Sequence, residues 1–393
     1  MNAVTELEKA AVTSAYKVDV SQGSRDGRVS SQWFNRPDDQ RFLNLDDLAS
    51  HVKARSDAAV QTIVDVDHIR VHASMNDPEK LSLEYHGMEV EPTHWAFGQL
   101  SSLAGAPAGY LRKLPATVAG INLQYGLQNL RSENAKLYYN ENQLLAATGT
   151  EYGRVHDYEL VEAVQRIAGN GVGDTRWKIP GVLDWSNGTY NPFVDPTKDT
   201  TTLYASDRDV FMFLVDDTHP IEIGKLKNGE PDLMFRGFYV FNSEVGSKTL
   251  GISTFMLRGV CANRNIWGQQ DKQSLSIRHS KNAPKRFASE VGPALIEYSN
   301  QSTLGVISDI NQAKSTIVAT NDDERFQWLG KQGFNAKQAK KIIDTVIQEE
   351  DTKPRSVWDF VQGVTAVARN IKHTDDRLDM EKIAGKLMTK AIH

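Results

Sequence analysis

Residues 210–254 alternate between apolar runs and turn residues, and this pattern limits the possible folds more than any other. Residues 210–215 and 235–241 are rich in β-branched and aromatic side chains, which are typical of strands. Asn228-Gly229 between them favours a tight hairpin turn. After a second turn, residues 248–254 can return alongside. Because consecutive strands joined by short turns pair antiparallel, we predict an antiparallel β-meander at the centre of the fold.

Helical patterns flank this block on both sides. From Thr93, apolar residues recur at helical spacing as far as Gly105, and glycine is favoured just beyond a helix C-terminus. Further along, Asn335 can cap a helix, and Ser356 begins a capping-box pattern before an apolar run. We therefore predict an α+β protein with an antiparallel β-meander core flanked by helices, followed by a helical C-terminal region.

The chain is expected to divide into three parts. Residues 1–30 lack periodicity and should form a flexible N-terminal arm. Residues 31–287 should form the α+β core, and residues 288–393 the helical C-terminal region. Within the core, residues 170–202 combine many glycines and prolines with four large aromatic side chains. That combination predicts a long functional loop more than a disordered one.

Composition excludes several classes of protein. The hydrophobic fraction of 40 % and the charged fraction of 24 % are ordinary for a globular protein. The longest apolar run is far shorter than the roughly 20 residues that span a bilayer, and the first residues lack the apolar segment of a secretory signal. The single cysteine, Cys261, excludes an internal disulfide and any multi-cysteine metal site. We expect a cytoplasmic protein of a bacterial cell, without a cofactor.

Residues 248–286, which we call the basic segment, have the most unusual charge. They hold eight basic side chains and one acidic side chain, a charge of +7 in a chain whose formal net charge is −5. Residues 1–247 carry −11 and residues 287–393 carry −1 by the same count. A local excess of this size attracts anions at short range. The basic side chains are those of Lys248, Arg258, Arg264, Lys272, Arg278, Lys281, Lys285 and Arg286.

The basic segment predicts a nucleic-acid interface. Contacts from Arg and Lys to phosphates supply most sequence-independent affinity for nucleic acid, and that affinity weakens steeply with salt. Asn263 and His279 lie among these cations, where they could hydrogen-bond sugar or phosphate. The alternative is a solvated basic face that pairs with the acidic first half of the same chain.

Trp177 is a further candidate for this interface. It lies between Arg176 and Lys178, a combination suited to stacking a base while holding a phosphate. The alternative is that the aromatic side chains of residues 170–202 pin this loop to its own domain. The residue types alone do not decide between these two roles.

Metal-ligand residue types occur in two places, both weak candidates. Asp216, Asp217 and His219 follow a predicted strand at a turn, and clustered carboxylates suit a hard cation, although turn acids are usually only solvated. In residues 65–72 the two aspartates and two histidines would face opposite sides of a strand, so they cannot converge on one ion. Cys261 lies in an apolar run, which is typical of a small core residue and not of a nucleophile.

No motif in the chain names an enzymatic reaction. Gly246-Ser247-Lys248-Thr249 lacks the spacing of a phosphate-binding loop. The sequence also contains no G-x-S-x-G, no H-E-x-x-H and no G-x-G-x-x-G. An enzyme remains an alternative, but we assign no catalytic residue.

The stretch FRGFYVFNSEVGSK at residues 235–248, with RGVCAN at 258–263, resembles the core signature of the phage/plasmid-like protein family. This is a domain-of-unknown-function family of prophages, phages and plasmids. Trp33 with residues 39–42, the helical block 93–114 and TEYGRV at 150–155 resemble it too, so the resemblance covers roughly residues 30–290, with helical family-like tails to about residue 390. It implies a mobile-element protein and carries over no catalytic residues. The β-meander with helices is also loosely similar to phage single-strand annealing proteins, which form rings that hold single-stranded DNA in a basic groove, and this is fold-level analogy.

Three hypotheses follow. The leading one is a non-catalytic protein, expected to be a homo-oligomer, that binds or anneals single-stranded nucleic acid in phage or plasmid DNA metabolism, with DNA favoured over RNA. The second is a protein–protein module that inhibits or remodels a host defence factor, with the acidic first half mimicking a nucleic-acid surface. The third is a metal-dependent nuclease or nucleotide-processing enzyme that uses Asp216, Asp217 and His219. None of them involves a membrane.

Overall fold

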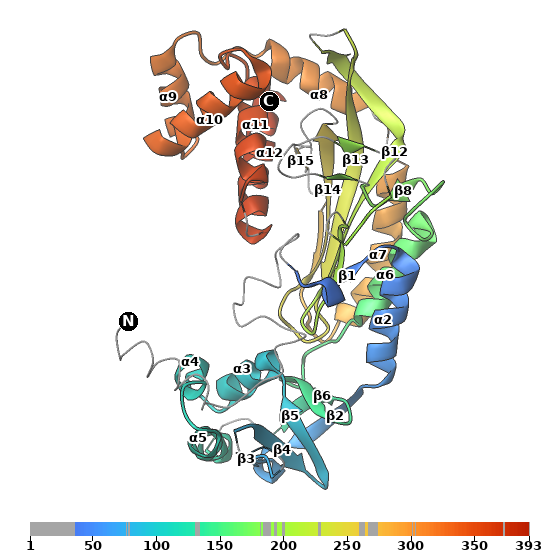
Figure 1. The fold of residues 1–393 in the computed structure, drawn as a ribbon, viewed down its shortest axis with the longest axis vertical. Coiled ribbons are helices and arrows are strands. Elements are labelled where there is room, and N and C mark those ends of the chain that lie inside the picture. Colours follow the sequence, from blue (N-terminus) through green and yellow to red (C-terminus); the bar gives the residue numbers. More distant parts are fainter. Residues whose placement is uncertain are drawn as a thin grey trace.

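The computed structural model has the predicted α+β class: antiparallel and mixed sheets with helices around them, and helices at the C-terminal end. Figure 1 shows a curved molecule in which long strands form the spine, with a smaller sheet at one end and the C-terminal helices at the other. The structure describes residues 36–75, 77, 79–129, 134–180, 182–183, 190–191, 195–198, 201–226, 229–258, 264–265, 274–300, 302, 304–371 and 374–392.

The central sheet has the order β1-β11-β12-β13-β14-β15, with β8 beside β12 and β16 beside β14. β12, β13 and β14 are consecutive antiparallel partners, which confirms the predicted β-meander. A register shift after Asp216 lets β12 continue as one long strand, well beyond the predicted strand at residues 210–215. The strands are β1 (Arg41–Phe42), β8 (Trp177–Lys178), β11 (Leu203–Ala205), β12 (Val210–Lys225), β13 (Pro231–Asn242), β14 (Leu250–Arg258), β15 (Arg264–Asn265) and β16 (Ser274–Ile277).

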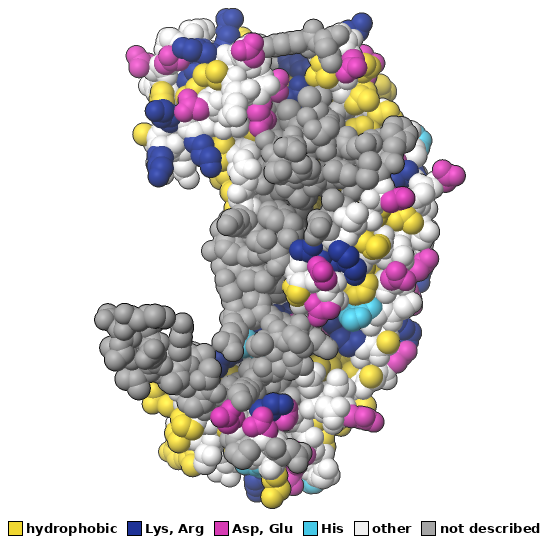
Figure 2. Space-filling model, in the orientation of Figure 1, with side chains coloured by type: hydrophobic (Ala, Val, Ile, Leu, Met, Phe, Trp, Pro, Cys, Tyr) yellow, Lys and Arg dark blue, Asp and Glu magenta, His cyan; other side chains and the backbone are white. Residues whose placement is uncertain are grey.

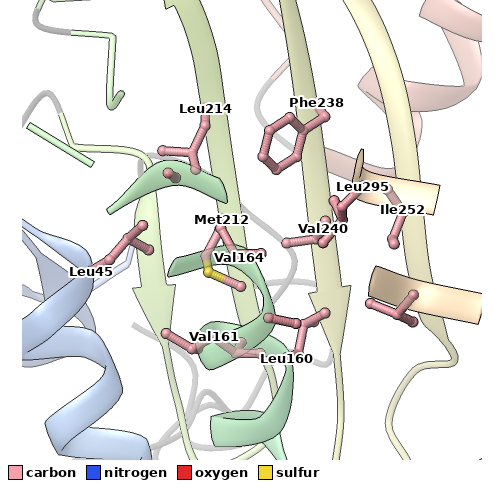
Figure 3. Close-up of a cluster of buried hydrophobic side chains, with 14 of the residues drawn as sticks. Leu45, Leu160, Val161, Val164, Met212, Leu214, Phe238, Val240, Ile252 and Leu295 are labelled. Carbon is pink, nitrogen blue, oxygen red and sulfur yellow. The ribbon is translucent and has the colours of Figure 1, made fainter. Parts of the chain in front are cut away.

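Successive side chains of a strand point to opposite sides of the sheet, so the central sheet has two different apolar faces. One face, with Phe238 and Val240 of β13, packs against the helices α2 (Leu45–Asp57), α6 (Asp157–Ala168) and α7 (Ala283–Ser299). Figure 3 shows Leu160 and Val161 of α6 and Leu45 of α2 gathered against this face. The opposite face carries a cluster of buried aromatic side chains from β11 to β14.

A second, six-stranded sheet has the order β2-β6-β7-β5-β4-β3. Its strands are β2 (Val60–Asp65), β3 (Arg70–Ala73), β4 (Leu81–Tyr85), β5 (Met88–Pro92), β6 (Asn134–Tyr139) and β7 (Gln143–Thr148). The helices α3 (His94–Leu103), α4 (Ala108–Leu111) and α5 (Ala116–Gln128) share a hydrophobic core with it. Thr93 caps α3 by accepting a hydrogen bond from the Ala96 amide, so the predicted helix start is confirmed.

The C-terminal helices are α8 (Leu304–Ser315), α9 (Asp322–Lys331), α10 (Ala336–Glu350), α11 (Val357–Arg369) and α12 (Thr374–Ile392). Asn335 and Ser356 form capping boxes at the starts of α10 and α11, as predicted. Side chains of α8 to α12 pack together with Ile221 and Met234 at one end of the central sheet. The earlier helix α7 belongs instead to the core of the central sheet.

Three short elements complete the described part: the 3-10 turns η2 (Asp38–Gln40) and η3 (Val66–His68), and the ribbon of β9 (Val182–Leu183) and β10 (Tyr190–Asn191). The predicted long loop 170–202 therefore contains β8, β9 and β10, while residues 184–189 and 192–194 lie outside the described residues. Among the helices described, none has both the length and the apolar character needed to cross a membrane.

Candidate ligand-binding cavity

Two arginines of the basic segment, Arg258 and Arg286, are paired with carboxylates of the same chain. Arg258 is buried, and its guanidinium donates to both carboxylate oxygens of Asp232 at 2.8 and 2.9 Å and to Glu350 at 2.5 Å. Arg286 makes a similar two-pronged pair with Glu290 at 2.7 and 2.8 Å. The prediction of a phosphate contact is therefore wrong for Arg258, whose buried guanidinium is held by two carboxylates. Arg286 is 43 % exposed beside its carboxylate partner, and for this residue the prediction stays untested.

His279 and Trp177 are buried as well. His279 is 8 % exposed, its Nδ1 lies 3.1 Å from the Gly153 carbonyl oxygen, and burial lowers its pKa, which favours the neutral ring. Trp177 is 1 % exposed and packs edge-on against Phe238 with 5.0 Å between ring centres. Neither side chain can contact a nucleic acid in this arrangement, so both predictions are corrected. Trp177 takes the alternative role and pins its segment to the core.

The remaining candidates of the basic segment differ in exposure. Arg278, Lys281 and Lys285 are exposed, and Lys281 lies 3.7 Å from Glu151. Lys248 is half-buried, with its Nζ 6.0 Å from the centre of the Phe241 ring. Outside the residues whose side chains are described lie Asn263, Arg264 and Lys272, and Cys261 lies there too.

The acidic turn at the bulge of β12 is held together by ion pairs. Asp216 accepts from Arg176 Nε at 2.8 Å, and Asp217 lies 3.0 Å from Lys178. Although burial acts to raise it, hydrogen bonds from Arg176 and His219 hold the pKa of Asp216 below its usual range. No group of three metal-ligand side chains that could hold an ion occurs in the described part of the chain. The weak metal candidate at Asp216, Asp217 and His219 is therefore not supported by the geometry.

A cavity of about 700 Å³ lies where the smaller sheet meets the turn between β13 and β14. Residues from α3, from the segment after β7 and from two turns of the central sheet converge on it. The described lining residues are His94, Trp95, Gly98, Gln99, Ser102, Leu103, Arg112, Ala147, Thr148, Gly149, Tyr152, Arg208 and Gly246. A concave site of this volume is large enough for a ligand of nucleotide size.

The cavity wall is built by hydrogen bonds that clip α3 to the central sheet. Trp95 Nε1 and Gln99 Nε2 both donate to the carbonyl oxygen of Val245, at 3.1 and 2.7 Å. The other end of the Gln99 amide accepts from the Ala147 amide at 2.9 Å. Gly246 follows at a φ of 89°, which favours glycine, and a Cβ there would lie 3.3 Å from the Tyr152 ring. The two sheets are thus joined at the cavity itself.

The charged side chains in the described part of the lining, histidine aside, are two arginines. Arg112 donates to the His94 carbonyl oxygen at 2.7 Å, and a Cβ at Gly98 would lie 3.2 Å from its Nη2, so a small residue leaves room for the guanidinium. Arg208 is 1 % exposed, and the hydroxyl of Ser247 donates to its carbonyl oxygen at 3.0 Å. Because Arg208 also lies 3.9 Å from Asp207, Arg112 is the side chain of the two that can attract an anion into this partly enclosed space.

The end of the basic segment adjoins this cavity. Lys136 donates to the carbonyl oxygen of Tyr152 at 2.8 Å, and the next amide, of Gly153, donates to the His279 carbonyl oxygen at 3.3 Å. Burial, with repulsion from Arg154 and Lys281, lowers the pKa of Lys136. The segment that contains Arg278 and Lys281 therefore runs beside Tyr152 in the cavity wall.

A buried ionic network lies at the same junction of the two sheets. Arg55 lies 2.6 Å from Asp157 and 3.0 Å from Glu244, and all three side chains are largely buried. Burial, helped by repulsion from Glu244, raises the pKa of Asp157 well above its usual range. Although burial opposes it, the charges of Arg55 and His156 lower the pKa of Glu244 to about 2. Arg55 therefore pairs with both carboxyl groups, and Glu244 holds its negative charge more readily than Asp157 does.

The sequence analysis missed Arg112, Arg208 and this network. Arg112 has only Lys113 beside it and Arg208 lies between two aspartates, so neither creates a large local excess of charge. Residues 93–114, 150–155 and 235–248, which the sequence analysis singled out, each contribute to the cavity wall. No protein-family model, curated protein or solved structure matches the chain. A function must therefore be argued from the geometry of the cavity.

Proposed function

We propose that this protein binds single-stranded nucleic acid, with a nucleotide unit in the cavity and the phosphate backbone continuing over the neighbouring cations. The observation that carries the proposal is the guanidinium group of Arg112 in the cavity wall. The guanidinium group matches phosphate oxygens in geometry as well as in charge.

Aromatic side chains in the same wall support a nucleotide ligand. Trp95 and Tyr152 line the cavity, and stacking on aromatic rings tolerates any base. Arg278 and Lys281 are exposed beside Tyr152, where they suit contacts to further phosphates. Binding would then be non-catalytic, salt-dependent and weakly sequence-selective. The resemblance of residues 235–248 suggests that the nucleic acid is that of a phage or plasmid.

The test is fluorescence anisotropy with labelled single-stranded oligonucleotides at low and high salt. We expect micromolar or tighter binding that weakens as salt rises, and about a tenfold loss of affinity in Arg112→Gln, since a charge-assisted hydrogen bond is lost. Arg286→Gln is the matched control: it removes the same charge, but Arg286 is already paired with Glu290. Absence of salt-sensitive binding, or equal losses in both variants, would contradict the proposal.

The exposed face of α5 favours a second function, docking of a host protein. Ile121 and Tyr125, one helical turn apart, are 64 % and 70 % exposed, and Val118 beside them is 42 % exposed. Figure 2 shows hydrophobic side chains at this corner of the molecule, lower left, over α4 and α5. A contiguous exposed apolar patch marks a contact surface more often than chance.

This second function has its own test. We expect Tyr125→Ser with Ile121→Ser to abolish copurification of a host protein from nuclease-treated extract while leaving oligonucleotide affinity unchanged. Val60→Ser on the edge strand β2, which is also exposed, is the control. Copurification that survives the double substitution would reject docking through α5.

A further inference from the structure

We propose that the C-terminal helices carry a second binding surface, which contacts the phosphate backbone of a nucleic-acid duplex. It is formed by exposed lysines at the end of the molecule opposite to the cavity (Figure 1). The inference is independent of the proposed function, since it concerns another surface and another form of nucleic acid. We call it the lysine surface, and its members are Lys331, Lys337, Lys340, Lys341, Lys386 and Lys390.

Two segments of these helices hold lysines without any acidic residue. Residues 327–343, from α9 into α10, contain four lysines, and residues 382–392 of α12 contain three. Apolar side chains of both segments, such as Ile342 and Leu387, pack in one core. Because the apolar side of each helix is buried in that core, the lysines are left on the outside, where all of them are exposed.

One hydrogen bond joins the two segments. Lys390 Nζ donates to Gln332 Oε1 at 2.8 Å, so the end of α12 lies against the turn between α9 and α10. Lys331 precedes Gln332, and Lys337 follows it in the first turn of α10. The other three members each lie one helical turn from Lys337 or Lys390, and residues at this spacing are neighbours on a helix. The six lysines therefore lie on adjoining turns of three helices, and Figure 2 shows basic side chains on this side of the molecule, upper left.

The lysine surface differs from Arg258, which is held by carboxylates of the chain. Within the part of the chain that the structure describes, none of the six lysines forms an ion pair with a carboxylate. Lys382, the seventh lysine of the two segments, pairs with Asp379 at 3.5 Å and is left out of the surface for that reason. The six ammonium groups thus keep their charge available to a partner.

The acidic residues that bound the two segments do not cancel this charge. Glu324 accepts hydrogen bonds from Thr320 before the start of α9. Glu381 is fully buried, and Asp344 is exposed in α10 beyond the lysines. Six cations beside these few acids leave a local positive excess, which attracts a polyanion although the whole chain is acidic.

The lysine surface offers charge without a platform for stacking a base. Trp328 and Phe334, the aromatic residues of the two segments, pack in the core, and the exposed ring of Phe326 lies more than a helical turn before Lys331. Lysine ammonium groups contact phosphates as point charges and read no base. A duplex keeps its bases inside and presents one negative charge per about 1.7 Å of its axis. It is therefore the nucleic acid that this surface fits best.

The experiment measures binding of a labelled DNA duplex of mixed sequence by fluorescence anisotropy over a range of salt concentrations. The variant is Lys337→Gln with Lys390→Gln, and the matched control is Lys53→Gln with Lys353→Gln. The control removes the same charge from two exposed lysines that are already paired with aspartates. Because each phosphate contact adds about one to the slope of log affinity against log salt, we expect the slope to fall by about two in the variant and to stay unchanged in the control.

A second variant separates charge from folding. Lys337→Arg with Lys390→Arg keeps both charges and should keep the wild-type slope, so loss of duplex binding there would overturn the proposal. Absence of salt-sensitive duplex binding at micromolar protein, or equal changes of slope in the glutamine variant and the control, would overturn it as well. Displacement of the duplex by polyglutamate at the same concentration of charge would show that the surface fits an acidic protein instead. Single-stranded binding that depends on Arg112 is measured separately, so either proposal can fail alone.

Discussion

The ring of Phe255 lies across the backbone of Gly237, its partner on the neighbouring strand of the central sheet. A Cβ at Gly237 would stand 2.0 Å from Cζ of that ring, and one at Gly251 would stand 2.3 Å from the ring of its own partner, Phe241. Tyr239 lies between them, with its ring within 20° of both. Rings can lie this close to a strand only where the residue beneath has no side chain, so the two glycines make the aromatic layer possible.

Gly237→Ala should therefore destabilise the protein strongly. The added methyl group must displace the Phe255 ring from a packed core, and overpacking of this kind lowers the free energy of unfolding by about 1–3 kcal/mol. Urea denaturation measures the change. Gly330→Ala in α9, where a Cβ would meet nothing within 4 Å, should instead raise stability by about 0.5–1 kcal/mol. Similar effects of the two substitutions would contradict this account of Gly237.

Glu244→Gln should lower stability at neutral pH by about 3 kcal/mol, because it leaves Arg55 buried without its counter-charge. The pKa of Glu244 is about 2 in the folded protein and near 4.5 when unfolded, so its contribution is present above pH 4.5 and disappears as pH falls toward 2. Denaturation at pH 7 and pH 3 should show the difference from wild type shrinking at the lower pH. Asp157→Asn is the control: burial raises the pKa of Asp157, so its charge contributes less to stability and its loss should cost less, and a larger loss there would reverse the assignment.

Asp207→Asn should raise stability at pH 7.5, by about 3 kcal/mol, because burial disfavours the ionised carboxyl. The pKa of Asp207 is about 6 when folded, above the ordinary value of 3.8, so the folded protein gains stability as pH falls through 6 and loses it as pH rises. The substitution removes that loss, and the gain over wild type should shrink at pH 5. The measurement is the thermal unfolding midpoint of variant and wild type at pH 7.5 and pH 5. A variant less stable than wild type at pH 7.5 would show that the carboxylate stabilises the fold.

Arg258→Met and Arg278→Met should show which residues of the basic segment stabilise the fold and which bind the oligonucleotide. Losing Arg258 leaves Asp232 buried without a partner, which should lower the free energy of unfolding by about 3–5 kcal/mol without changing the oligonucleotide affinity of the folded protein. Losing the exposed Arg278 should change stability by less than about 0.5 kcal/mol but weaken binding. The two measurements on each variant check this, and weaker binding by folded Arg258→Met would restore the original prediction for that residue.

Local sequence determined much of the fold. The β-meander follows from strand-forming runs separated by turn residues, and the starts of α3, α10 and α11 follow from Thr93, Asn335 and Ser356, as predicted. Each of these features depends on residues within a few positions of one another, so each can be predicted from the sequence.

Only the tertiary structure decided which charges are available. Arg258 looked like a free cation in its own segment, but its partners Asp232 and Glu350 come from another strand and from a helix 92 residues away. Arg112 and Arg208 are far apart in the sequence, yet the packing of the two sheets puts both in one cavity wall. The physical reason is that electrostatic and packing interactions depend on distance in space, and the folding of the chain sets that distance independently of separation in sequence.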